Sequence, residues 1–146
     1  MKRLICIFIL AFLQLFICVH KTFAQTANEN AFTGPENVQK VIYFDFNNYT
    51  IKSEFNSVID SHAQFLRLNP RSRVSIEGHD DGQNSSQEFS LSLGHLRAAS
   101  VINALLSKGV SPSQFEAISL GSVKPAVAGD EEVARTKNRR VEFFYK

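Results

Sequence analysis

His79, Asp80 and Asp81 stand together in the stretch IEGHDDGQ, residues 76–83, directly after a run typical of a β-strand. Three chemistries could use such a group: metal coordination, acid–base catalysis, or one half of a clamp for a charged ligand. Metal binding is disfavoured, because neighbouring side chains in extended backbone point to opposite faces and no further His or acid cluster follows at ligand spacing. A simple polar turn that ends the strand is the alternative to the clamp.

Catalysis has little support elsewhere in the chain. The sequence contains no nucleophile elbow, no phosphate-binding loop and no dinucleotide fingerprint. Adjacent carboxylates such as Asp80 and Asp81 rarely share a substrate, and no activating partner is visible for either. We therefore expect a binding protein that is not an enzyme and that has no cofactor and no bound metal.

Arg97 is the second unusual residue, because it interrupts an apolar row of a predicted helix. It lies between Leu93 and Val101 at a spacing of four residues, which places all three on one side of the helix. A guanidinium in such a row must extend to solvent along its own stem or pair with an acid. If Arg97 faces the loop with Asp80 and Asp81, the acid can bind an ammonium and the arginine a carboxylate.

The elements that position these residues follow from hydrophobic periodicity. Strands are expected at residues 41–46, 74–78, 115–120 and 140–145. Helices are expected from about residue 53 to Pro70 and over residues 88–108. Residues 121–138 are expected to form a long loop that could contain a helical turn at 131–135. The order β-α-β-α-β-β predicts an α+β domain, with a mixed sheet and both helices packed on one face.

The first 24 residues are typical of a secretory signal peptide. Lys2 and Arg3 precede an apolar run, and small residues lead to an expected cleavage after Ala24. The run is shorter than the roughly 20 apolar residues that a membrane span requires. Residues 25–37 are polar and predict a short flexible leader, which leaves residues 38–146 for one domain.

Charge and cysteine content exclude further classes. Without the three basic residues of the signal segment, 13 basic and 14 acidic residues remain. A nucleic-acid-binding surface would need an excess of basic residues, so no nucleic acid partner is expected. Both cysteines, Cys6 and Cys18, lie in the signal segment, which leaves the domain without disulfides and without cysteine-ligated zinc.

Four stretches resemble the OmpA-like peptidoglycan-binding domain, and the peptidoglycan-associated lipoproteins (Pal) are the most similar subgroup. They are YFDFNNYTIKSEF, FLRLNPRSRVSIEGHDD, SLSLGHLRAASVINALLSKGVS and KNRRVEFFY, which occur in the expected order between about Val41 and Tyr145. The resemblance implies a periplasmic domain that binds peptidoglycan non-covalently. It also implies that the ligand group is the diaminopimelate of the stem peptide.

The resemblance further implies roles for individual residues. The aspartate of the family's Gly-His-x-Asp motif, which accepts the ligand ammonium, corresponds to Asp81. The arginine of the Arg-Ala motif, which binds the ligand carboxylate, corresponds to Arg97. The asparagine after the Phe-Asp-x element corresponds to Asn47, which is expected to line the site. Supporting or ligand-facing roles are expected for the Asn-Arg-Arg motif, Asn138, Arg139 and Arg140.

The sequence departs from the family pattern in three ways. The stretch from Asp81 to Arg97 is one residue longer than usual, which keeps Asp80 as an alternative ligand contact. Ser90 replaces the usual asparagine seven residues before the arginine, so one ligand hydrogen bond is expected to be weakened. No lipidated cysteine is recognisable, which leaves attachment to the outer membrane open. The alternative function is a periplasmic interaction module that docks a TolB-like protein and has weak or lost peptidoglycan binding.

Overall fold

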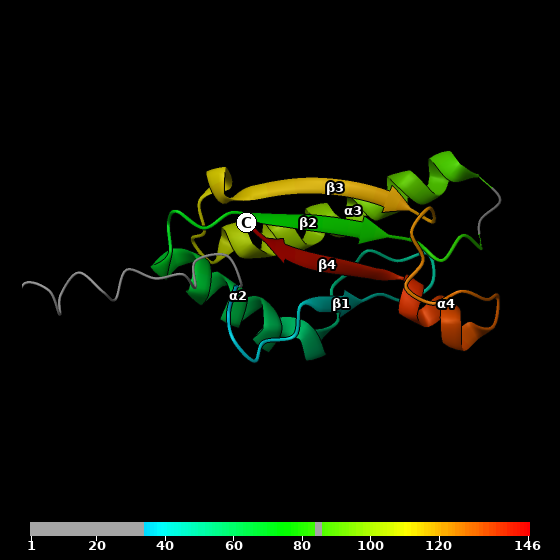
Figure 1. Ribbon diagram of the computed structural model, residues 1–146, viewed down its shortest axis with the longest axis horizontal. Helices are drawn as coiled ribbons and strands as arrows, with labels where there is room; N and C mark the ends of the chain where they lie inside the picture. Colours follow the sequence, from blue (N-terminus) through cyan, green and yellow to red (C-terminus); the bar gives the residue numbers. More distant parts are fainter. Residues whose placement is uncertain (1–33, 84–85) are drawn as a thin grey trace, which may run out of the picture. The chain divides into compact units, whose positions relative to one another are not determined.

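The computed structural model describes residues 34–83 and 86–146 (Figure 1). The predicted signal peptide and residues 25–33 of the predicted leader lie outside the described residues. The last leader residues, 34–37, lie beside the domain, and a Cβ atom at Gly34 would approach the ring of Tyr145 to 2.3 Å. This contact ties the start of the described chain to the last strand.

Four strands form one mixed sheet in the spatial order β1-β4-β2-β3. Strand β4 runs antiparallel to both β1 and β2, whereas β2 and β3 are parallel. The strands are β1 (Val41–Tyr43), β2 (Val74–His79), β3 (Phe115–Gly121) and β4 (Arg140–Tyr145). The predicted α+β fold with a mixed sheet is confirmed.

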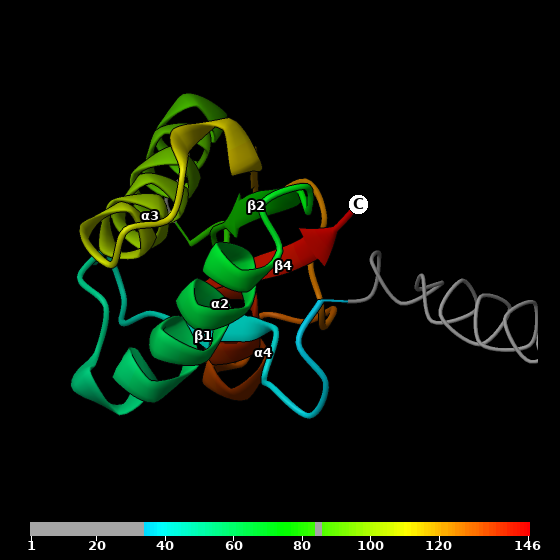
Figure 2. The same ribbon diagram turned by 90° about the vertical axis from the view of Figure 1, so that its left-hand side faces the viewer.

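Two long helices cover one face of this sheet (Figures 1 and 2). They are α2 (Asn56–Leu68), which follows a single 3-10 turn η1 (Ser53–Phe55), and α3 (Gln87–Ser107). Alternate strand residues such as Ile76 and Val141 point toward these helices, as the period of two in a half-covered sheet requires. The core unites both helices and three strands through Ile42, Val74, Ile76, Val141, Phe143, Ile59, Ala63, Leu66, Ala98, Val101 and Leu105. The predicted packing of both helices on one face is confirmed.

Two boundaries differ from the sequence expectation. Strand β1 ends at Tyr43 instead of residue 46, because the chain turns over residues 45–48 with Asn47 at a positive φ of 50°. Residues 132–138 form a short helix, α4 (Glu132–Asn138), where a loop with one turn at 131–135 was expected. Glu132 in its first turn and Lys137 in its last turn both have the charge that favours a helix end.

Helix α3 crosses β2 at two glycines. A Cβ atom at Gly78 would lie 1.9 Å from the carbonyl oxygen of Gly94, so the two backbones are in direct contact. Only glycine permits such an approach. Ser90 and Arg97 lie about one turn before and one turn after Gly94, on the same side of the helix. The crossing therefore fixes where both side chains meet the end of β2.

Candidate functional site

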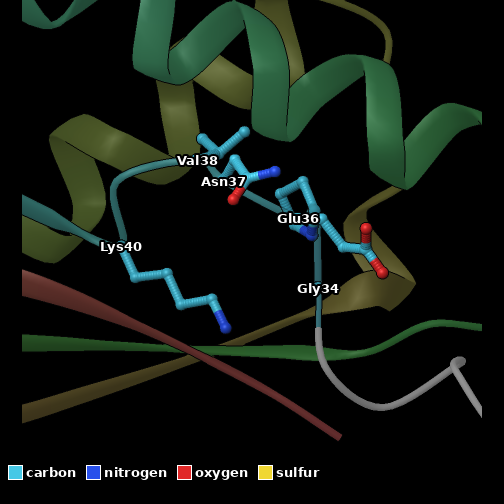
Figure 3. A pocket seen from close by; sticks show the side chains of 6 residues that line it. Gly34, Glu36, Asn37, Val38 and Lys40 are labelled. Atoms are coloured by element: carbon cyan, nitrogen blue, oxygen red, sulfur yellow. The ribbon is translucent and has the colours of Figure 1, made fainter.

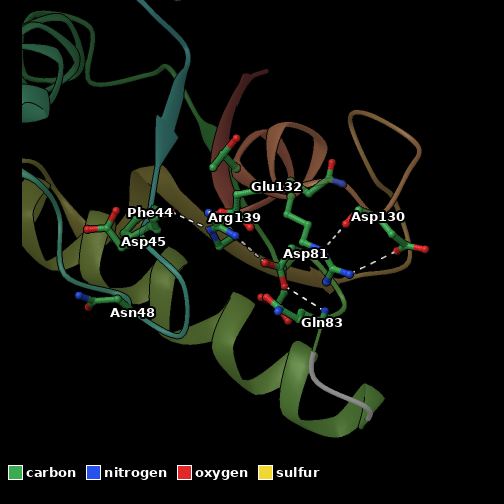
Figure 4. A network of polar contacts seen from close by, with 12 residues as sticks. Phe44, Asp45, Asn48, Asp81, Gln83, Asp130, Glu132 and Arg139 are labelled. Carbon is green, nitrogen blue, oxygen red and sulfur yellow. Dashed lines mark hydrogen bonds and ion pairs between the residues drawn. The ribbon is translucent and has the colours of Figure 1, made fainter.

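Two of the predicted site residues, Asp81 and Arg139, lie together where β2 ends and β4 begins (Figure 4). Strand β2 has an irregularity between Gly78 and His79, and the amide of Asp80 then donates to the carbonyl of Gly121 at 2.8 Å. The alternation of side chains carries His79 to the face of the sheet that the helices leave uncovered and Asp80 to the helix side. His79 and Asp80 therefore lie on opposite faces of the sheet.

Asp80 is buried between two residues of α3. Its Oδ1 atom lies 3.2 Å from Nη1 of Arg97, and its Oδ2 atom accepts a hydrogen bond from Oγ of Ser90 at 2.8 Å. The side chain of Asp80 is 1% exposed and that of Arg97 is 0% exposed. Arg97 therefore faces the predicted loop, and its ion-pair partner there is Asp80, the residue kept as the alternative ligand contact.

The guanidinium of Arg97 is enclosed by backbone carbonyls as well. Nε donates to Asn48 O at 2.9 Å, Nη1 donates to His79 O at 2.6 Å, and Nη2 donates to Asp45 O at 3.3 Å. Together with the bond to Asp80, these contacts use four of the five N–H groups of the guanidinium. Burial lowers the pKa of Arg97, while the carboxylate of Asp80 acts in the opposite direction. Arg97 joins α3 to the end of β2 and to the turn after β1.

Asp81 belongs to a second ion pair, with Arg139. Nη1 of Arg139 donates to Oδ2 of Asp81 at 2.8 Å, and Nη2 donates to Oε1 of Glu132 at 2.6 Å. The other oxygen of Asp81 accepts the amide of Gln83 at 3.0 Å (Figure 4). Burial opposes the charge of Arg139, but the two carboxylates raise its pKa above the ordinary value. The side chain of Asp81 is shielded, whereas that of Glu132 is 68% exposed.

The remaining predicted residues have separate places. Asn47 is exposed and lies in the turn that encloses Arg97. Oδ1 of Asn138 accepts the amides of Ala126 and Val127 at 2.8 and 3.1 Å. Nη2 of Arg140 donates to Lys124 O at 3.3 Å. Asn138 and Arg140 thus hold the loop before α4, and only Arg139 of this motif joins the acidic residues.

Sequence reasoning missed Glu132 and the carbonyls that surround Arg97. Glu132 lies seven residues before Arg139, a spacing that brings two side chains to one side of a helix. The expected helical turn ended at residue 135, so the spacing did not predict that Glu132 and Arg139 would lie on one side of a helix. Backbone carbonyls have no side-chain signature, and no pattern could have identified them.

The cluster formed by Asp80, Asp81, Glu132, Arg97 and Arg139 carries three formal negative charges and two positive ones. Its formal charge of −1 favours a cationic group of a ligand at the exposed side, where Glu132 lies. Over residues 34–83 and 86–146, no three His, Cys, Asp or Glu side chains are placed to hold a metal ion.

A separate hollow of about 290 Å³ lies at the start of the described chain (Figure 3). Residues 34–38 and Lys40 line it, and none of the predicted site residues takes part. The hollow is formed by one short segment and contains no converging set of buried charges. The acidic and basic cluster at the end of β2 is therefore the candidate site.

Solved structures resemble this fold closely. The crystal structure of the peptidoglycan-associated lipoprotein from Burkholderia pseudomallei superposes with a TM-score of 0.73 at 35% identity, covering 74% of this chain and 91% of that one. The C-terminal domain of Helicobacter pylori MotB gives a TM-score of 0.62 at 28% identity, with 71% and 83% of the two chains covered.

Known sequences point in the same direction. The peptidoglycan-associated lipoprotein of Pasteurella multocida is 39% identical over 104 residues, which are 71% of this chain and 69% of that protein. The protein of the same name from Haemophilus influenzae is 38% identical over 104 residues, with 71% and 67% covered. The model of the OmpA family matches residues 43–139, from the end of β1 to the arginine that pairs with Asp81. The chain therefore belongs to the OmpA family.

Proposed function

We propose that this protein is a non-enzymatic binding domain of the cell envelope that holds peptidoglycan non-covalently. Membership of the OmpA family and 39% identity to a peptidoglycan-associated lipoprotein support this proposal. The observation that carries it is the cluster of oppositely charged, shielded side chains around Asp81 and Arg97. The signal-like first segment supports a periplasmic location, and the relatives' name supports association with the outer membrane.

The proposed ligand group is the diaminopimelate of the stem peptide, which carries an ammonium and a carboxylate on one carbon atom. In this proposal Asp81 accepts the ammonium, and Arg97 provides its remaining N–H group to the carboxylate. Charge-assisted hydrogen bonds of this kind are about twice as strong as neutral ones. Ser90 and Asp80 orient Arg97, Arg139 orients Asp81, and Asn47 lines the site from the turn after β1.

Co-sedimentation of the mature protein with purified peptidoglycan tests the proposal. We expect Asp81→Ala to weaken binding at least thirtyfold, because loss of one partner of a shielded charge pair costs about 2 kcal/mol or more. Arg97→Lys keeps the charge but loses N–H groups that hold Asp80 and the turn after β1, so it should also weaken binding. Asp130→Ala, at a side chain that is 99% exposed, is the matched control. Sedimentation of Asp81→Ala and Arg97→Lys equal to that of the unsubstituted protein would contradict the proposal.

A second candidate function is docking of a TolB-like periplasmic protein with little peptidoglycan binding. The observation that favours it is the complete enclosure of Arg97, whose N–H groups are largely engaged within the domain. Titration calorimetry with free diaminopimelate separates the two functions. Heat of binding supports the peptidoglycan ligand, and its absence together with capture of a purified TolB-like protein supports docking.

A further inference from the structure

We propose that Asp80 occupies the place at Arg97 that a ligand carboxylate would take, and thereby makes the site selective for the ammonium of its ligand. The inference rests on the proposed peptidoglycan binding and specifies the chemistry of the same site. It predicts that stem peptides with lysine at the third position bind about as well as those with diaminopimelate. The two amino acids share the distal ammonium, and only diaminopimelate has the distal carboxylate.

Asp80 is held firmly in the position that it takes. Its carboxylate contacts Arg97 through one oxygen and accepts the hydroxyl of Ser90 through the other. Its amide is fixed to the carbonyl of Gly121 at 2.8 Å. Rotation of this side chain away from Arg97 would break the bond to Ser90 and leave a buried charge unpaired, which is costly. The ion pair between Asp80 and the guanidinium of Arg97 is therefore expected to persist when a ligand binds.

Arg97 has too few N–H groups left for a second carboxylate. Recognition of a carboxylate by a guanidinium in the usual bidentate form requires two parallel N–H groups. Asp80 and the carbonyls of Asn48, His79 and Asp45 take four of the five. A ligand carboxylate would find a single donor beside a fixed negative charge, so its contribution to affinity is small.

The opposite end of the cluster suits an ammonium. The side chain of Asp81 is 0% exposed and accepts two hydrogen bonds, from Gln83 and Arg139, out of about four that a carboxylate can accept. Glu132 adds a carboxylate that is largely exposed, next to the same arginine. The surplus of one negative charge in the cluster is neutralised by one ammonium and increased by a carboxylate.

Two synthetic tripeptides that differ only in the distal carboxylate test this inference. They are L-Ala-γ-D-Glu-meso-diaminopimelate and L-Ala-γ-D-Glu-L-Lys, titrated calorimetrically into the mature protein. We expect their dissociation constants to agree within about threefold, because the carboxylate adds one weak contact at most. In Asp80→Thr, which removes the carboxylate from Arg97, we expect the diaminopimelate peptide to bind at least tenfold more tightly than the lysine peptide.

Asp80→Asn is the second variant, because it is isosteric and can keep the contact with Ser90 while it releases the guanidinium. Asp80→Asn should also bind the diaminopimelate peptide at least tenfold more tightly than the lysine peptide. Asp130→Asn should bind the two peptides about equally, as the unsubstituted protein is expected to do. A tenfold preference for diaminopimelate in the unsubstituted protein, or the same ratio in all variants, overturns the inference and leaves the proposed function intact. Binding of neither peptide and of no peptidoglycan overturns the proposed function together with the inference.

Discussion

Asp80 and Asp81 are neighbours in the chain but belong to two different kinds of ion pair. The pair of Asp80 and Arg97 is closed: both side chains are buried, and backbone carbonyls from two other segments complete the shell. The pair of Asp81 and Arg139 extends to Glu132, whose carboxylate reaches solvent. One pair therefore braces the fold, and the other leads from the interior to the surface.

We expect this difference to let one polar loop combine stability with binding. Removing either arginine leaves a buried carboxylate without its charged partner, but the second network also contains Glu132, whose carboxylate stays in contact with water. We therefore expect Arg97 to matter most for folding and Asp81 with Arg139 to respond most to a ligand. The predictions below test this division, starting with the largest effect.

Arg97→Ala should lower the free energy of unfolding by about 3–5 kcal/mol, because it leaves the carboxylate of Asp80 buried and unpaired. Arg139→Ala should cost about 3 kcal/mol, because it leaves the buried carboxylate of Asp81 without its charged partner, while the amide of Gln83 still donates to it. Urea denaturation at pH 7 measures both. Arg135→Ala removes an arginine whose partner, Asp130, is fully solvated, and should cost less than about 0.5 kcal/mol. Equal losses for Arg97→Ala and Arg139→Ala would remove the distinction between the two pairs.

Acid should weaken the fold through two buried histidines. Burial lowers the pKa of His62 and of His79 from 6.5 to about 4. Each is therefore neutral in the folded state and binds a proton more readily when unfolded. The contribution of the two neutral histidines to the free energy of unfolding is complete above pH 6.5. It is lost as the pH falls toward 4, by up to about 3 kcal/mol for each histidine.

Free energies of unfolding measured between pH 7 and 4 check this loss of stability, which appears as a slope against pH. His79→Gln and His62→Gln should each flatten it, and His95→Gln, at an exposed helical position, should leave it unchanged. Because the carbonyl of His79 accepts from Nη1 of Arg97, the protection of the Arg97 guanidinium against hydrogen exchange should fall in acid before that of Arg139. Simultaneous loss of protection at both arginines would argue against a separate closed pair.

Ser90→Ala removes the hydroxyl that donates to Asp80. We expect a loss of about 1.5 kcal/mol, because one acceptor of a buried carboxylate loses its partner. Ser92→Ala, an exposed position two residues further along α3, should change stability by less than about 0.5 kcal/mol. If thermal or urea denaturation gave the same small change for both, Ser90 would have no part in fixing Asp80.

Glu132→Gln should have the smallest effect, below about 0.5 kcal/mol in urea denaturation, because its side chain is 68% exposed and solvent screens the pair. The same substitution should weaken peptidoglycan sedimentation by a few-fold, since it removes a charge at the open side of the cluster. A loss of stability as large as that of Arg139→Ala would show that the second pair is closed as well.

The sequence predicted the sheet, both long helices and the approach of Arg97 to the loop after β2. These followed from periodicity and from a charged residue in an apolar row, which are local properties of the chain. The predicted end of β1 and the predicted extent of the helical turn at 131–135 were wrong, because the turn with Asn47 at a positive φ begins earlier than the apolar pattern ends, and Asn138 holds the loop at Ala126 and Val127. The choice of Asp80 as the partner of Arg97 depends on which way each side chain leaves the irregular end of β2. Residue spacing alone contains no such information.

The contact between Gly78 and Gly94 limits how far the backbone of this site can move. With no side chain between the two backbones, α3 has no room to move toward the sheet, and any larger residue would lift the whole helix away. Substitutions at positions such as 80, 90 and 97 would therefore exchange side chains on a backbone whose spacing the two glycines fix.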